Sequence, residues 1–357
     1  MIDGRSATTV SRWVEVHRLA VAGREPVITR RVGSQVARVW LRTSRFADAA
    51  ALANATLTLG PDAGALYDLG WAQSATGQLR HALGNYEQAL HLYRRAGDRG
   101  NEAATLNNIG GVYDRLGDRQ QALTYYRQAL PITREVGDRA GEAAILNNIG
   151  HLYNGLGDRQ QALTYYRQAL PTLREVGNRG GEATTLNNIG IVYNGLGDRQ
   201  QALTYYRQAL SIRREVGDRA GEGDSLNNIG HVYDQLGDRQ QALTHYRQAL
   251  PITREVGDRA GEATTLNCIG AIRFQEDDFA GAKELLDEAL EVVRVIADRA
   301  SEAMAGFNMA VLLTRMARLD EAIEFQRRAV TLAEQTSHPA LDRMRAFLVE
   351  LEQKKKG

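Results

Sequence analysis

One segment, which begins Leu-Asn-Asn-Ile-Gly and ends Tyr-Arg-Gln-Ala-Leu, recurs four times with few changes. The copies start at Leu106, Leu146, Leu186 and Leu226, so their period is 40 residues. A fixed period of this length indicates a solenoid, in which each unit buries its apolar face only against its neighbours. Such a chain builds an extended surface and no closed enzyme core, which favours binding over catalysis.

Each copy predicts two helices joined by a short turn. In the first helix the apolar and small residues recur at spacings of three and four, at Leu106, Ile109, Gly110 and Tyr113. Gly117 suits the end of that helix, and Asp118 suits the start of the next. The second helix presents one face with Ala122, Tyr126, Ala129 and Leu130. We therefore expect Tyr126, Tyr166, Tyr206 and Tyr246 to be buried, and Tyr125, Tyr165, Tyr205 and His245 to face outward.

This pattern resembles the tetratricopeptide repeat, in the longer 40-residue form found in kinesin-light-chain-type repeats and in bacterial signalling proteins. The residues that carry the resemblance are Leu106, Ile109, Gly110, Tyr113, Ala122, Tyr126 and Ala129. It implies an all-α fold, a right-handed superhelix of antiparallel helix pairs. Weaker copies flank the four strong ones, so we expect eight units over residues 26–337, strongest over 106–265. Residues 1–25 and 338–357 are expected to form capping helices, the second with a basic tail.

Composition excludes several classes of function. The 44 basic and 43 acidic residues leave a net charge of +1, which predicts no attraction to nucleic acid or to a membrane surface. There is no long apolar run and no signal-peptide pattern, and we expect a cytoplasmic protein. The basic residues are almost all Arg, which suggests a GC-rich bacterial genome.

Little in the sequence points to catalysis, a cofactor or a metal. The chain has a single cysteine, Cys268, without a nucleophile signature, and its seven histidines form no pair at metal-ligand spacing. His151 and His231 occupy equivalent positions two units apart and are expected on the solvated surface. The Gly-Asp-Arg segments are interpreted as helix junctions with exposed ion pairs. We therefore predict no enzyme, no cofactor and no metal site.

One set of residues is a candidate binding site. The resemblance implies a concave groove lined by the first helices, in which asparagines hold the backbone of a bound peptide. An amide offers two donors and an acceptor, which a peptide backbone needs. The alternative is that these amides bond to a neighbouring helix or to water. The asparagines are Asn108, Asn148, Asn188, Asn228 and Asn308.

The strong units differ from one another mainly beside these asparagines. One variable position holds Gly111, His151, Ile191 and His231, and a second holds Asp114, Asn154, Asn194 and Asp234. Variation over a copied frame is expected of a tuned ligand surface, although drift at exposed positions gives a similar pattern. We include His151, Ile191, His231, Asp114, Asn154, Asn194 and Asp234 among the candidate binding residues.

Three hypotheses for the function follow. The first is a non-enzymatic scaffold that binds a protein or peptide segment, as the interaction or sensor part of a bacterial signalling or regulatory system. The second is a structural solenoid that assembles with copies of itself. The third is an enzyme built on the inter-unit loops, which are too short to carry one. We favour the first, with the chain a monomer or a weak homo-oligomer.

Overall fold

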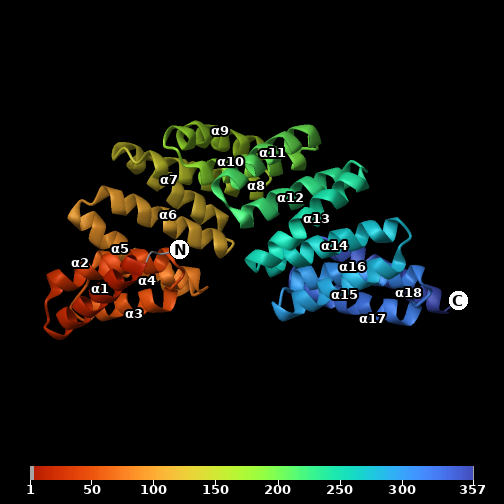
Figure 1. Ribbon diagram of the computed structural model, residues 1–357, viewed down its shortest axis with the longest axis horizontal. Helices are drawn as coiled ribbons and strands as arrows, with labels where there is room; N and C mark the ends of the chain where they lie inside the picture. The colour runs from red at the N-terminus through yellow and green to blue at the C-terminus, as the bar shows by residue number, and fades with distance from the viewer. Residues whose placement is uncertain (1–3, 357) are drawn as a thin grey trace. The chain divides into compact units, whose positions relative to one another are not determined.

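The computed structural model describes residues 4–356, and the part of the chain it describes folds into helices alone. They divide into two compact units, Met1–Asn178 and Arg179–Gly357, each described by itself. The first unit holds nine helices (Figure 1): α1 (Gly4–Ala22), α2 (Pro26–Arg42), α3 (Phe46–Leu57), α4 (Ala63–Ala75), α5 (Leu79–Ala96), α6 (Arg99–Arg115), α7 (Arg119–Glu135), α8 (Arg139–Gly155) and α9 (Arg159–Glu175).

The second unit also holds nine helices: α10 (Arg179–Gly195), α11 (Arg199–Val216), α12 (Arg219–Gln235), α13 (Arg239–Val256), α14 (Arg259–Gln275), α15 (Phe279–Val295), α16 (Arg299–Arg315), α17 (Leu319–Gln335) and α18 (Leu341–Lys356). In both units each even-numbered helix from α2 to α16 packs against the helix that follows it. The predicted all-α solenoid of antiparallel helix pairs is therefore confirmed. The assignment of residues 1–25 and 338–357 as caps stays a prediction. Helix α1 lies in the first of these ranges and α18 in the second.

The helix boundaries have the local cause that the sequence indicates. Gly117 has a φ of +83°, a left-handed conformation that ends α6 and reverses the chain. The side chain of Asp118 then accepts a hydrogen bond from the backbone N–H of Gln121 at 3.0 Å and caps α7. The same two-residue device stands at the start of most helices in the copied units, which keeps every junction short.

The core of a helix pair rests on one tyrosine and one glycine. Tyr126 on α7 is 3% exposed and lies against Gly110 on α6. A Cβ added at Gly110 would stand 2.7 Å from the Tyr126 ring, so only glycine admits the ring. The prediction that the second tyrosine of each pair is buried is confirmed for Tyr126, Tyr166, Tyr206 and Tyr246.

The prediction for the preceding residue is wrong. Tyr125 does not face outward but is half-buried, and its ring stacks on Tyr113 with centroids 5.4 Å apart. The equivalent stacks are Tyr153 with Tyr165, Tyr193 with Tyr205 and Tyr233 with His245. The helical period alone gave the wrong answer, because a large aromatic ring beside the apolar face can lean onto the aromatic residue of the partner helix.

A repeated ion-pair network ties neighbouring helices together and was not foreseen. Glu142 on α8 is only 6% exposed and accepts hydrogen bonds from Arg134 at 2.7 Å and Arg139 at 2.5 Å. In the second unit burial raises the pKa of the equivalent Glu222. The hydrogen bonds from Arg214 and Arg219 outweigh that effect and hold this pKa below its ordinary value. The carboxylates of these glutamates are buried and doubly paired, a feature that was not predicted from the sequence.

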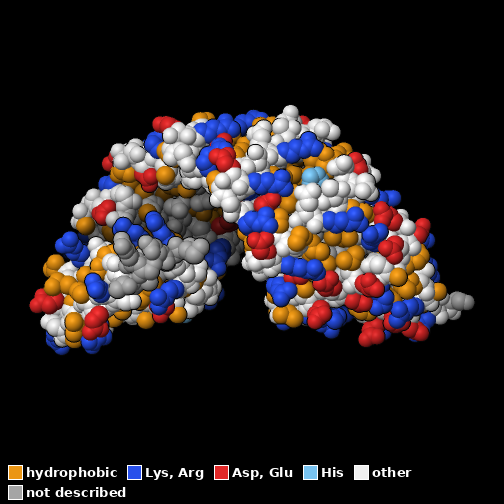
Figure 2. Space-filling view, viewed as in Figure 1, with side chains coloured by type: hydrophobic (Ala, Val, Ile, Leu, Met, Phe, Trp, Pro, Cys, Tyr) orange, Lys and Arg blue, Asp and Glu red, His pale blue; other side chains and the backbone are white. Residues whose placement is uncertain are grey.

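The remaining surface carries both signs of charge. Figure 2 shows basic and acidic side chains interspersed over the visible faces of the units. None of the helices in the described part of the chain is long and apolar enough to cross a membrane.

Candidate functional site

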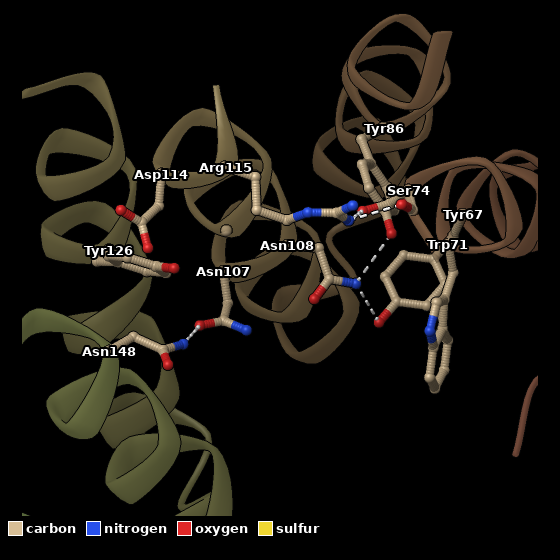
Figure 3. A pocket seen from close by; sticks show the side chains of 11 residues that line it. Tyr67, Trp71, Ser74, Tyr86, Asn107, Asn108, Asp114, Arg115, Tyr126 and Asn148 are labelled. Atoms are coloured by element: carbon tan, nitrogen blue, oxygen red, sulfur yellow. Dashed lines mark hydrogen bonds between the residues drawn. The ribbon is translucent and has the colours of Figure 1, made fainter. Parts of the chain in front are cut away.

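The first helices of three successive pairs line a groove in the Met1–Asn178 unit. Its volume is about 430 Å³, and α4, α6 and α8 contribute most of its walls. Figure 3 shows the side chains of this groove, with Asn107 and Asn108 between Tyr126 on one side and Tyr67, Trp71 and Tyr86 on the other. The lining residues are Tyr67, Trp71, Ser74, Tyr86, Asn107, Asn108, Gly111, Asp114, Arg115, Tyr126 and Asn148.

The asparagine amides of this groove are partly occupied by neighbouring helices. The Nδ2 of Asn108 donates a hydrogen bond to the Tyr67 hydroxyl at 2.9 Å, and the Nδ2 of Asn148 donates to Oδ1 of Asn107 at 3.1 Å (Figure 3). The alternative raised for the sequence, that these asparagines bond to a neighbouring helix, thus holds for the two amide nitrogens. Within the described residues, Oδ1 of Asn108, Oδ1 of Asn148 and Nδ2 of Asn107 have no hydrogen-bond partner. Those three groups remain available to a ligand.

The same amide pairing recurs in the Arg179–Gly357 unit. Asn228 donates to Oδ1 of Asn187 at 3.1 Å, and Asn308 donates to Oδ1 of Asn267 at 3.0 Å. Asn188 is half-buried on α10. The amides of Asn228 and Asn308 therefore each link one first helix to the preceding one. In this unit Cys268 takes the place of the asparagine at the equivalent position of α14. Burial raises the pKa of its thiol to about 11.

The variable positions beside the asparagines lie where a ligand could reach them. His151 on α8 is exposed, with Nε2 3.8 Å from Oδ2 of Asp114 on α6. In the second unit Ile191 is 40% exposed, and the ring of His231 contacts the side-chain amide of Gln235 at 2.8 Å. The members of the second variable position, Asp114, Asn154, Asn194 and Asp234, are all half-buried on the same helices.

Several groove residues were not foreseen from the sequence. Tyr67 and Trp71 lie on α4, at the positions that Asn107 and Gly111 take on α6, and their rings meet edge to face with centroids 6.4 Å apart. Arg115 donates from Nη1 to the backbone oxygen of Ser74 at 2.6 Å and so fixes its guanidinium in the groove. The sequence did carry a signal for Tyr67: the unit that contains α4 reads Leu-Tyr-Asp where the copied units read Leu-Asn-Asn.

Family profiles of the tetratricopeptide repeat match residues 101–175, 181–255 and 261–335. The chain belongs to the tetratricopeptide repeat family. No curated protein matches it in sequence. The described residues of this tetratricopeptide repeat protein also contain no cluster of three or more metal-ligating side chains.

Solved structures share the fold of this tetratricopeptide repeat protein at low sequence identity. The apo quorum sensor NprR from B. thuringiensis is 16% identical, with a TM-score of 0.70, over 93% of this chain and 99% of that one. The Rap conjugation gene regulator of plasmid pLS20, in complex with the Phr* peptide, is 14% identical, with a TM-score of 0.59, over 92% and 95%. BtubC (BKLC) from P. vanneervenii is 23% identical, with a TM-score of 0.50, over 71% and 91%.

Proposed function

We propose that this protein is a non-enzymatic scaffold that holds an extended segment of a peptide or protein against its first helices. The observation that carries the proposal is the row of unused amide atoms in the groove, on Asn107, Asn108 and Asn148. Peptide backbone presents alternating donors and acceptors, and such atoms pair with it whatever its side chains. Specificity would then come from the neighbouring exposed positions, of which His151 and Ile191 are examples.

Geometry supports an extended ligand. Successive first helices carry equivalent asparagines one repeat apart, and packed helices stand roughly 8–10 Å from each other. About three residues of extended chain cover that distance at roughly 3.3 Å per residue. The fold is shared with a regulator whose solved complex contains a peptide and with a quorum sensor. Both likenesses favour a sensor or regulatory role in a bacterial cytoplasm for this chain too.

The experiment starts from a peptide selected against the full chain from a random displayed library. Asn148→Ala should weaken binding of that peptide by about 1–3 kcal/mol in calorimetry, because a desolvated backbone donor loses its acceptor. Gln128→Ala, which removes an exposed amide from the outer helix α7, is the matched control and should leave affinity unchanged. Thermal melts of both variants separate lost binding from lost folding, since Asn148 also bonds to Asn107.

Two results would overturn the proposal. If Gln128→Ala weakens binding as much as Asn148→Ala, the outer face binds the peptide. If no peptide is selected and light scattering shows long assemblies, the chain is a structural solenoid. Ile191→Ala extends the test to the second unit, where it should change which peptides are preferred more than how tightly they bind.

A further inference from the structure

A second cleft opens at the N-terminal side of the groove in the Met1–Asn178 unit. It has a volume of about 660 Å³ and lies between α2 and the α4–α6 region. Tyr67 and Trp71 line both the cleft and the groove, so the two spaces adjoin. Trp71 is 38% exposed, unusually open for a tryptophan, and gives the cleft an aromatic wall.

Two of the arginines around this cleft have no partner among the described residues. Asp62 caps α4 by accepting from the N–H of Ala65 at 2.8 Å and also faces Arg30 at 3.3 Å. Asp98 caps α6 and accepts hydrogen bonds from Asn101. Both carboxylates therefore already accept hydrogen bonds within the fold, and Asp98 keeps its negative charge without a cationic partner in the described part of the chain. Arg31 and Arg38 are exposed on α2, and neither guanidinium has an ion-pair or hydrogen-bond partner among the residues that the structure describes.

Asp68 is the third acidic residue of the cleft, and its charge is weak near neutral pH. Burial, reinforced by Asp62 and opposed by Arg38, raises the pKa of Asp68 to about 7. Burial also raises the pKa of Tyr67 and Tyr93, which stay neutral in this range. The charged and titratable groups around Asp68 are Arg30, Arg31 and Arg38 of α2, Asp62 before α4, Tyr67 of α4, Tyr86 and Tyr93 of α5, and Asp98 before α6. With Asp68 protonated, the lining carries three arginines against the two carboxylates of Asp62 and Asp98, a net charge of +1.

We propose that this cleft is a subsite for acidic side chains, Asp or Glu, of the extended polypeptide segment that occupies the groove. The inference rests on the proposed function and specifies its ligand. Arg31 and Arg38 lie seven residues apart on one helix, which is roughly 10 Å along its axis at 1.5 Å per residue. An extended chain places side chains about three residues apart at that distance. Guanidinium groups bind carboxylates through paired, charge-assisted hydrogen bonds.

The aromatic wall and Asp68 add two properties to the subsite. Tyr67 and Trp71 can cover the apolar stems of the acidic residues, which lowers the dielectric around the ion pairs. Ionised Asp68 repels a bound carboxylate, whereas protonated Asp68 can donate a hydrogen bond to one. Binding of an acidic segment is therefore tighter below about pH 7 than above it.

The first test measures fluorescence anisotropy of labelled, C-terminally amidated oligo-glutamate with the full chain. Oligo-glutamate should bind, and oligo-glutamine and oligo-lysine of equal length should not. Arg31→Gln with Arg38→Gln should lower the affinity by about ten- to a hundredfold. The control is Arg80→Gln with Arg95→Gln on α5, two exposed arginines that also lack an ion pair and lie outside the cleft. It removes the same net charge and should change affinity by no more than about twofold at physiological salt.

The second test follows pH. Affinity for oligo-glutamate should rise between pH 8 and pH 6 in the native chain, and Asp68→Asn should hold it near the pH 6 value throughout. The proposal is overturned if the α5 double variant loses as much affinity as the α2 double variant, or if oligo-lysine binds equally well. It is also overturned if oligo-glutamate binds only when its C-terminal carboxylate is left free instead of amidated, because the ligand is then the chain end and not the side chains. A pH dependence that survives in Asp68→Asn overturns the part assigned to Asp68.

A third comparison separates this inference from the proposed function. A library-selected peptide that loses affinity with Asn148→Ala but not with the α2 double variant leaves the groove standing and rejects the acidic subsite. A peptide that loses affinity with neither variant rejects the groove, and with it the inference that depends on it.

Discussion

The first helix pairs of the Met1–Asn178 unit and the copied pairs that follow share a frame but differ in the groove. Tyr86 packs on Gly70 as Tyr126 packs on Gly110, with an added Cβ standing 2.9 and 2.7 Å from the ring. The groove face of α4 carries Tyr67, Asp68 and Trp71, where α6 carries two asparagines and a glycine. Packing constrains the frame residues closely, whereas the groove residues are free to specify a ligand.

If the frame is common to both regions, its tyrosines should cost the same to remove. We expect Tyr86→Ala and Tyr126→Ala each to lower the free energy of unfolding by about 3–5 kcal/mol, because each leaves a ring-sized cavity in a fully packed site. Tyr125→Ala removes a half-buried stacked ring and should cost about 1 kcal/mol. Chemical denaturation followed by circular dichroism measures all three. A much smaller loss at Tyr86 would show that the first pairs have a different core.

The glycine beneath the tyrosine gives the next largest effect. Gly150→Ala places a Cβ 2.7 Å from the Tyr166 ring, and we expect it to cost about 1–3 kcal/mol through overpacking. Gly270→Ala is the matched control, since its Cβ meets the flexible Leu286 at 3.2 Å and alanine favours the helix. Thermal unfolding should therefore separate the two variants. Equal losses would mean that backbone conformation and not the ring requires glycine there.

The charge of Asp68 distinguishes the two regions in a pH-dependent way. Its pKa is raised to about 7 in the folded chain, so ionisation above that pH destabilises the fold. The penalty disappears as the pH falls through 7 toward the unfolded-state pKa of about 4. Asp68→Asn should therefore stabilise the protein by about 1–2 kcal/mol at pH 8 and by less than half of that at pH 5.

The reciprocal change tests whether the position or the residue is responsible. Asn108→Asp puts a carboxylate into the copied pair and removes the amide that donates a hydrogen bond to the Tyr67 hydroxyl. The loss of unfolding free energy that it causes should therefore grow as the pH rises. Denaturant titrations at pH 5 and pH 8 give both values. If Asp68→Asn has the same effect at the two pH values, its carboxylate is not desolvated in the folded protein.

The frame could be predicted from the sequence because its causes are local. The buried face of each helix pair follows from the spacing of Leu106, Ile109 and Gly110. The helix ends and their caps follow from the glycine–aspartate junctions. The stacking of Tyr125 on Tyr113 could not be predicted, because it depends on which way a ring at the edge of that face leans. The cleft between α2 and α4 was missed for a related reason. Arg31 and Arg38 could be recognised only once the fold placed them in one cleft with Tyr67 and Trp71 and without an ion-pair partner among the residues described.

The smallest expected effect lies where one copy departs from the others in the Arg179–Gly357 unit. Cys268 takes the place of the asparagines that elsewhere join one first helix to the next, as Asn228 joins Asn187. Cys268→Asn would direct an amide toward Asn227, whose Oδ1 accepts one hydrogen bond from Thr265 and has a second lone pair free for another. We expect a gain of about 0.5–1 kcal/mol in thermal unfolding, the net value of one neutral hydrogen bond. Asn228→Cys should lose a similar amount by removing an amide that is already bonded. If both variants unfold as the native chain does, the amide row contributes nothing to stability, and its asparagines are then better explained by the ligand than by the fold.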